Sequence, residues 1–254
     1  MSLLKYFLAF FLVFNSYFDS TAQVGKIKVV VIDAGHGGKD PGTAKGKEKK
    51  IALAIALKLG AKIKENMPNV KVIYTRKTDV FIPLHERAAI ANRNKADLFI
   101  SVHCNAMPNS SATYGTETYT MGLHKTQENL SLAKRENEVV LMEDNYKKSY
   151  KGFNPNSPLA HIMLANFQSA FMKQSLQFAA KVERQMANAG QRSRGVKQAG
   201  FLVLWETTMP SVLIETGYLT NSKEAKTLES ADGQEKIANA IYKAFKSYKE
   251  EVEK

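Results

Sequence analysis

Residues Lys28–Gly38, KVVVIDAGHGG, give the clearest indication of the fold class. A run of apolar, mostly β-branched residues leads directly into a glycine-rich turn that carries His36. Such a run, ended by a turn, is typical of a strand buried on both faces of a sheet. The pattern recurs at Asp97–His103, DLFISVH. Both segments therefore predict buried strands that each deliver a histidine to the C-terminal end.

Helical and strand-like segments alternate outward from these two strands. Predicted strands lie at Lys28–Asp33, Val70–Thr75, Asp97–His103, Gly115–Thr120, Phe201–Leu204 and Ser211–Glu215. Predicted helices lie at Glu48–Lys64, Pro83–Lys95, Thr126–Asn145, Pro158–Ala189 and Gly233–Val252. This order predicts a single-domain α/β fold, with a mainly parallel or mixed sheet of about six strands flanked by helices. A helical insertion is expected at about residues 122–160.

The N-terminal segment, residues 1–22, has the form of a secretory signal peptide. An early cation at Lys5 precedes the apolar run Tyr6–Phe14, and small residues precede Gln23, where we expect cleavage. An uncleaved membrane anchor is the alternative, but the apolar run is shorter than the roughly 20 residues of a spanning helix. We therefore expect an exported, periplasmic catalytic domain over residues 23–254, with no stable membrane insertion after cleavage.

Charge and cysteine content restrict the partners and the stabilising chemistry. The formal net charge is +12, which favours polyanionic partners, although a basic surface also serves solubility. The sequence contains no nucleic-acid recognition signature, so anionic envelope material is the preferred partner. Cys104 is the only cysteine, which excludes an intramolecular disulfide and a zinc site built from cysteines. Because it follows His103 in an alternating strand, Cys104 is expected to be buried core.

Four polar residues lie at predicted strand ends or at a helix start beside one: His36, Glu48, His103 and Glu215. Strand ends of an α/β sheet gather at one edge, where active sites form. Two histidines and a carboxylate are a common ligand set for catalytic zinc, and a further carboxylate suits proton transfer. Taken singly, each is as consistent with a structural role. The remaining histidines are expected to be surface or packing residues: His85, His124 and His161.

The local sequences around these residues resemble a known family. VVVIDAGHGGKDPG (Val29–Gly42), LFISVHCNA (Leu98–Ala106), GTETY (Gly115–Tyr119) and PSVLIETGYLTN (Pro210–Asn221) are similar to the zinc-dependent N-acetylmuramoyl-L-alanine amidases of the amidase-3 type. The resemblance extends in order from about Lys28 to Tyr248. It implies hydrolysis of the amide between N-acetylmuramic acid and L-alanine in peptidoglycan by zinc-activated water.

The resemblance also implies residue roles. One Zn²⁺ ion would be bound by His36, Glu48 and His103, and Glu215 would act as general base and then as general acid. Arg87 matches an arginine of the family's corresponding helix; we expect it to support the site or to meet a substrate carboxylate, unless it forms only a surface ion pair with Glu86 or Asp79. Glu117 also matches a position of the family, but the resemblance does not assign it a role.

The acidic segment Thr126–Asn145 coincides with an inserted helix that, in the resembling family, can cover the zinc site until a partner removes it. This suggests an autoinhibitory plug in which one of three carboxylates takes the open zinc position, and an activator protein that displaces the helix. The candidates are Glu136, Glu138 and Glu143. A solvated helix with ion pairs such as Lys134 with Glu138 is the alternative.

Two other functions remain open from the sequence. A zinc peptidase acting on stem peptides would use the same ligand set, and would release amino acids while leaving the lactyl amide intact. The second alternative function is that of a wall-binding regulatory module without catalysis. The presence of His36, Glu48, His103 and Glu215 argues against it.

Overall fold

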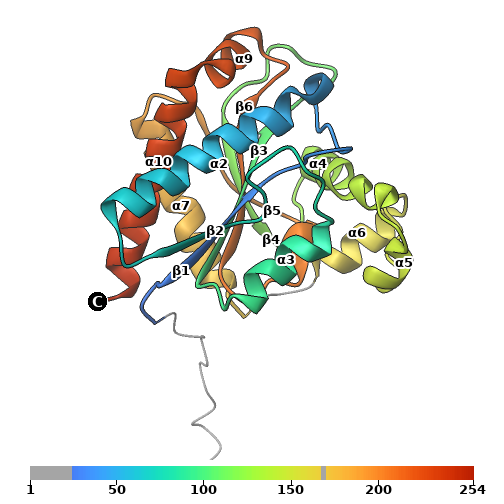
Figure 1. Ribbon diagram of the computed structural model, residues 1–254. Coiled ribbons are helices and arrows are strands. Elements are labelled where there is room, and N and C mark those ends of the chain that lie inside the picture. The colour runs from blue at the N-terminus through green and yellow to red at the C-terminus, as the bar shows by residue number, and fades with distance from the viewer. Residues whose placement is uncertain (1–24, 167–169) are drawn as a thin grey trace, which may run out of the picture.

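The computed structural model describes residues 25–166 and 170–254, so the predicted signal peptide lies outside the described residues. A six-stranded mixed sheet with helices on both faces confirms the predicted α/β class (Figure 1). None of the helices within the described ranges is both long enough and apolar enough to cross a membrane.

The sheet has the strand order β2-β1-β3-β6-β4-β5. Strands β2, β1, β3 and β6 are parallel, β4 is antiparallel to β6, and β5 is parallel to β4. The bounds are β1 Val29–Ala34, β2 Lys71–Tyr74, β3 Leu98–Asn105, β4 Thr116–Met121, β5 Ser193–Ala199 and β6 Ser211–Tyr218. Because β1, β3 and β6 run in the same direction, their C-terminal ends meet at one edge of the sheet.

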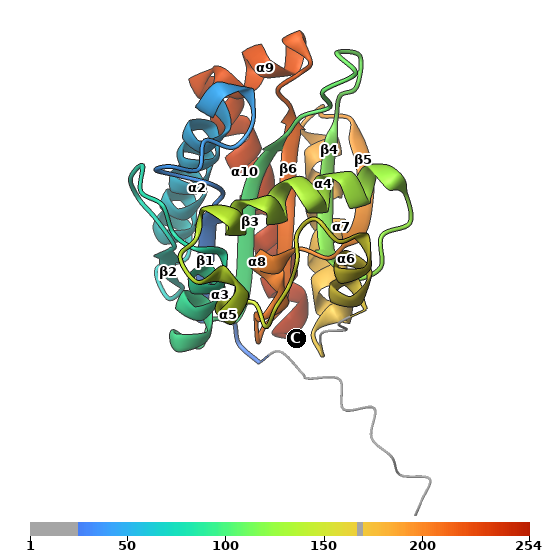
Figure 2. The same cartoon turned by 90° about the vertical axis from the view of Figure 1, so that its right-hand side faces the viewer.

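Helices cover both faces of the sheet. On one face, α2 (Lys47–Asn66), α7 (Met172–Asn188) and α10 (Ala231–Val252) pack on a core that includes Ile55, Phe178 and Phe245. The opposite face is covered by shorter elements, as Figure 2 shows. They are α3 (Leu84–Arg93), α4 (Gln127–Asn137), the 3-10 helix η2 (Glu138–Met142), α5 (Tyr146–Ser149), α6 (Pro158–Ala165) and α8 (Leu202–Trp205). The short 3-10 helix η1 (Ala44–Gly46) precedes α2, and α9 (Ser222–Glu229) precedes α10.

The sixth strand differs from the prediction. Phe201–Leu204 was expected as a strand, but the segment forms the buried helix α8, because a short apolar run does not distinguish a buried strand from a buried helical turn. The strand in its place is β5, SRGVKQA, at the edge of the sheet. Its residues are mostly only half-buried, so it lacks the apolar signal of the central strands.

The helical section between β4 and β5 is also more divided than predicted. Thr126–Asn145 contains α4 and η2 rather than one helix, and Pro158–Ala189 contains α6 and α7. A single helix over the latter range is wrong because its two halves pack on opposite faces of the sheet. Leu164 of α6 belongs to the core beneath α4, whereas Phe178 of α7 belongs to the core beneath α10.

Candidate metal centre and active site

Three chain segments bring His36, Glu48 and His103 together. His36 follows β1, Glu48 lies in the first turn of α2, and His103 lies near the end of β3. The His36 Nε2 atom is 3.0 Å from Glu48 Oε1 and 3.2 Å from His103 Nδ1, and the latter is 3.3 Å from Glu48 Oε1. The structure therefore assembles the three predicted ligands from positions up to 67 residues apart.

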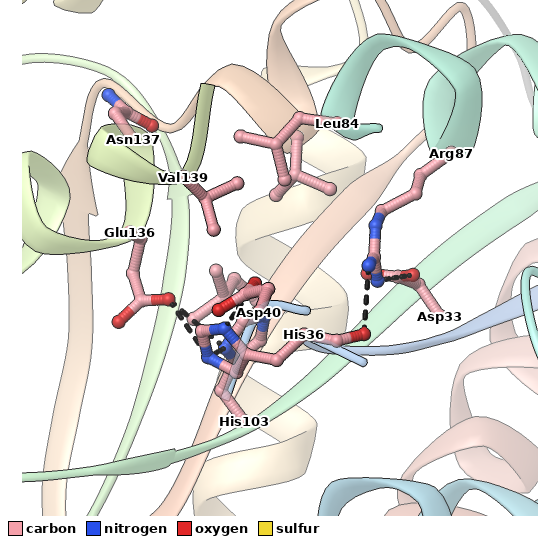
Figure 3. Close-up of a pocket in the computed structure, with 11 residues that line it drawn as sticks. Asp33, His36, Asp40, Leu84, Arg87, His103, Glu136, Asn137 and Val139 are labelled. Atoms are coloured by element: carbon pink, nitrogen blue, oxygen red, sulfur yellow. Dashed lines mark hydrogen bonds and ion pairs between the residues drawn. The ribbon is translucent and has the colours of Figure 1, made fainter. Parts of the chain in front are cut away.

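A fourth side chain completes this cluster. Glu136, near the end of α4, places Oε2 at 3.3 Å from both His36 Nε2 and His103 Nδ1 (Figure 3). One ligand atom from each of the four buried residues lies within 4.8 Å of all the others. Of the three glutamates proposed for the plug, Glu136 is the one that reaches the ligand cluster.

The spacing and charge of the cluster fit a divalent metal ion. Metal–ligand bonds of about 2.0–2.2 Å in a tetrahedron place the ligand atoms roughly 3.3–3.6 Å apart. The contacts that involve the two histidines are 3.0–3.3 Å, and one ligand atom of each of the four residues lies within 4.8 Å of all the others, so the group is compact enough to surround one ion. Two imidazoles with two carboxylates are a donor set that suits zinc, and the two carboxylate charges would balance a dication. Metal binding is thus the chemistry that these side chains support.

The electrostatics of the cluster also favour positive charge. Burial alone would raise the pKa of Glu48, but the neighbouring His36 charge and hydrogen bonds from both histidines hold that pKa well below its usual range. For His103, burial lowers the pKa, and the bonds to Glu136 and Glu48 outweigh it and raise the pKa to about 9. A site that retains protons on its imidazoles in this way is one where a cation is stabilised.

Glycines and backbone strain allow the β1–α2 loop to approach the cluster. A Cβ on Gly35 would lie 2.4 Å from the ring of His103, so no other residue fits there without moving that ring. His36 itself has a left-handed backbone with φ of 59°. Such strain in a non-glycine residue is maintained when surrounding contacts impose it, and it concentrates at functional sites.

Two buried arginines impose that loop conformation. Arg76 donates hydrogen bonds to the carbonyls of Ala34 and Gly35, and Arg87 donates to those of Ala34 and His36. Arg87 also pairs with buried Asp33 at 2.8 Å (Figure 3). Its exposure is 1%, so the surface ion pair with Glu86 or Asp79 is wrong, and the geometry favours support of the site over contact with a substrate carboxylate.

Asp40 orients the first histidine. Its Oδ2 atom lies 2.8 Å from His36 Nδ1, which leaves Nε2 directed into the cluster. A carboxylate behind a ligating imidazole fixes the ring and raises its basicity, and removing it typically costs 10–100-fold in metal affinity.

We expect Asp40→Ala to weaken zinc binding by about tenfold while the fold persists. Competition against a chromogenic chelator measures the affinity, and circular dichroism checks the fold. Asp144→Ala, at an exposed position of the same chain, is the matched control. Unchanged affinity in the Asp40 variant would contradict the orienting role.

Glu215 lies beside the cluster on the neighbouring strand. In the sheet register it pairs directly with His103, so the two side chains emerge from adjacent strands. The residue is fully buried, and neither carboxylate oxygen has a hydrogen-bond partner among the described residues. Burial, followed by repulsion from Glu136, raises its pKa well above the usual value. A buried carboxylate without a partner, next to a metal cluster, is positioned to accept a proton from a molecule in the site.

The other two plug candidates lie outside the cluster. Glu143 accepts hydrogen bonds from the Leu84 amide and the Tyr150 hydroxyl, and lies 3.2 Å from His85 Nδ1. It therefore attaches the insertion to α3 rather than reaching the metal ligands. Glu138 is exposed on η2.

The remaining reactive side chains have structural surroundings. Cys104 is 1% exposed within the core beneath α2, as predicted, and burial raises its thiol pKa well above the usual value. His161 is buried, with its ring 2.9 Å from the Pro155 carbonyl, and His124 is half-buried.

Sequence reasoning missed the supporting residues Asp40 and Arg76, and left the role of Glu117 open. The i,i+4 spacing of His36 and Asp40 in one short loop was the available signal. Arg76 follows β2, and only the tertiary structure brings it to the loop after β1.

Comparison with known proteins agrees with this arrangement. Residues 30–247 match the family model Amidase_3, N-acetylmuramoyl-L-alanine amidase. N-acetylmuramoyl-L-alanine amidase AmiC of Escherichia coli is 33% identical over 228 residues, which cover 87% of this chain. They cover 52% of AmiC, so the chain spans about half the length of that relative.

Solved structures of the same family share the fold. The catalytic domain of the amidase CwlV from Bacillus (Paenibacillus) polymyxa is 34% identical, with a TM-score of 0.61 over 87% of this chain and 97% of that chain. The amidase CwlD from Clostridioides difficile, solved in complex with the GerS lipoprotein, is 28% identical, with a TM-score of 0.63. The match covers 87% of this chain and 98% of CwlD. The chain therefore belongs to the Amidase_3 family of N-acetylmuramoyl-L-alanine amidases, which are peptidoglycan amide hydrolases.

Proposed function

We propose that this protein is a zinc-dependent amidase that hydrolyses the bond between N-acetylmuramic acid and L-alanine. The observation that carries the proposal is buried Glu215 beside the cluster of His36, Glu48 and His103, with no hydrogen-bond partner in residues 25–166 and 170–254. Family membership supplies the substrate class, and the four side chains are those that such a hydrolysis requires.

His36, Glu48 and His103 would hold the ion. Zinc bound there would supply Lewis acidity and lower the pKa of water from 15.7 to about 7. Glu215 would take a proton from the attacking water onto its carboxylate, since its burial favours the protonated form. It would then donate that proton to the leaving nitrogen of L-alanine. Asp40, Arg76 and Arg87 keep the His36 loop in place during both steps.

We further propose that the structure represents an autoinhibited state. Three protein ligands would leave a catalytic zinc with one position for water or substrate, and Glu136, whose Oε2 atom lies 3.3 Å from both histidines, would take that position. Withdrawal of α4 would vacate that position. A partner that binds the insertion is the expected activator, and the complex of the relative CwlD with a lipoprotein supports the existence of such partners in this family.

Export to the periplasm remains part of this proposal. It depends on the predicted signal peptide at residues 1–22 and on the location of the expected substrate, peptidoglycan. The excess of positive charge suits anionic envelope material rather than nucleic acid.

Digestion of purified peptidoglycan tests the function. With the Glu136→Gln chain, in which the proposed plug is weakened, we expect new amino termini at L-alanine, one zinc ion per chain, and loss of cleavage on chelation with recovery on adding zinc. Release of free amino acids with intact lactyl amides would instead identify a peptidase. Absence of any cleavage, with the helix α4 displaced, would indicate a wall-binding module.

A further inference from the structure

Four neighbouring strands place charged side chains in one row. His103 on β3 pairs with Glu215 on β6, and Glu215 pairs with Glu117 on β4. On β4, Glu117 lies between Thr116 and Thr118, which pair with Ser193 and Val196 of β5. This position brings Glu117 opposite Arg194 of β5. With strands about 4.7–4.9 Å apart, the row extends roughly 14 Å from the metal ligands to Arg194.

The far end of this row carries a surplus of positive charge. Glu117 Oε1 lies 2.5 Å from both Arg194 Nε and Lys197 Nζ, and Tyr218 also donates to that oxygen. Burial raises the pKa of Glu117, but the two cations outweigh it and keep the carboxyl ionised. Within the sheet, two cations therefore share one carboxylate, so one positive charge is available to a further anion.

Helix α4 follows the same row from above. Figure 2 shows it crossing the strands β3, β6, β4 and β5. Glu136 contacts the metal ligands, and Glu128, eight residues earlier, lies 3.5 Å from Arg194 Nη2. Eight helical residues span about 12 Å, close to the length of the row. Helix α4 thus places one carboxylate at each end of the row: Glu136 at the metal ligands and Glu128 at Arg194.

A cavity already exists between α4 and the sheet. It has a volume of 420 Å³, and its floor includes Asn105, Glu117 and Tyr218, whereas Glu128 and Arg135 of α4 form part of its other wall. Arg194 contacts Glu117 and Glu128, which both line this cavity. Glu128 is 58% exposed, and an ion pair so exposed contributes little, so it is readily exchanged for another anion.

We propose that Arg194 and Lys197 form a subsite for a carboxylate of the stem peptide, and that α4 imitates the substrate by placing Glu128 there and Glu136 at the metal. This inference rests on the proposed function. The lactyl carboxyl of muramic acid is consumed in the scissile amide, so free carboxylates belong to the peptide. An extended peptide covers 12–14 Å in about four residues, which matches the length of the row.

Calorimetric binding to the zinc-loaded, full-length Glu136→Gln chain tests the subsite. Two probes are compared, and both are a tripeptide of L-Ala, γ-linked D-Glu and a diamino acid. The first probe keeps its free carboxylates, and in the second every carboxylate is converted to a carboxamide. We expect the free form to bind at least about tenfold more tightly. Lys197→Gln, added to this chain, should remove most of that preference without changing the affinity for the carboxamide, and Lys197→Arg should retain it.

Lys58→Gln, which removes a cation from the outer surface of α2, is the matched control and should leave the preference intact. Glu128→Gln should tighten binding of the free tripeptide about two- to fivefold by removing the competing carboxylate. Equal affinity for both probes, or no binding of either, would overturn the subsite even if peptidoglycan is cleaved at L-alanine. Conversely, failure of that cleavage while the carboxylate preference persists would reject the amidase function alone.

Discussion

Glu215→Gln should lower the rate of peptidoglycan hydrolysis by about 10³-fold while zinc content stays at one ion per chain. Positioned acid–base groups typically contribute 10²–10⁴-fold, and glutamine keeps the shape of the side chain but takes no proton. Glu215 is outside the set of His36, Glu48 and His103 that we propose as ligands, so metal binding should persist. Release of labelled peptide from dyed peptidoglycan, together with metal analysis, measures both quantities.

The same substitution should stabilise the metal-free fold. Because burial raises the pKa of Glu215, the folded chain retains its proton to higher pH than the unfolded chain. The stability of the unsubstituted protein therefore falls as pH rises above the ordinary value of 4.5, toward the raised pKa. Glutamine has no such titration, so we expect the stability of the variant relative to the unsubstituted protein to increase between pH 4.5 and pH 7.

Urea unfolding at pH 4.5 and 7 measures this difference, which should be larger at the higher pH. Glu250→Gln, at an exposed position of α10, is the control and should have little effect. Full activity in Glu215→Gln would discard the assignment of the general base, whereas lost activity with lost zinc would make it a ligand instead.

Glu136→Gln should increase hydrolysis by about tenfold or more. The substitution removes the carboxylate charge that lies 3.3 Å from both histidines, and a contact to a charged group contributes roughly 1.5–3 kcal/mol. Weaker contacts between α4 and the two histidines increase the fraction of molecules in which α4 has left the site. Initial rates on labelled peptidoglycan, at equal zinc loading, report the change.

Glu138→Gln provides a close control, because it removes an equal charge two residues away at an exposed position. It should leave the rate nearly unchanged. A rate that does not rise in Glu136→Gln, or that rises equally in both variants, would contradict the plug and would leave α4 as an ordinary cover of the sheet.

The central strands were predictable because their signals are local. VVVID before His36 and LFISV before His103 are continuous apolar runs, and the chain must bury them on both faces of a sheet. The edge strand β5 has the half-polar sequence SRGVKQA, and its pairing with β4 depends on a partner more than 70 residues away. Strand pairing of this kind has no local signal, whereas the apolar run Phe201–Leu204 has the composition of a buried strand and therefore predicts one.

The chemical types of the site residues were likewise readable from the sequence, although their partners were not. A histidine after a buried strand indicates a position at the edge of the sheet, and the resemblance assigned the roles of His36, Glu48, His103 and Glu215. Which insertion glutamate approaches the cluster is a matter of where α4 crosses the sheet. Glu136 and Glu143 are both acidic and buried, yet one faces two imidazoles and the other binds the start of α3.

The α/β class, the buried central strands and the kinds of side chain available for chemistry could all be predicted from the sequence, because apolar periodicity and residue type are properties of short segments. Tertiary packing sets which atoms come into contact: the four-residue cluster, the loop held by Arg76 and Arg87, and the row from His103 to Arg194. These depend on contacts between segments far apart in the chain, whose geometry follows from how the whole sheet and its helices pack.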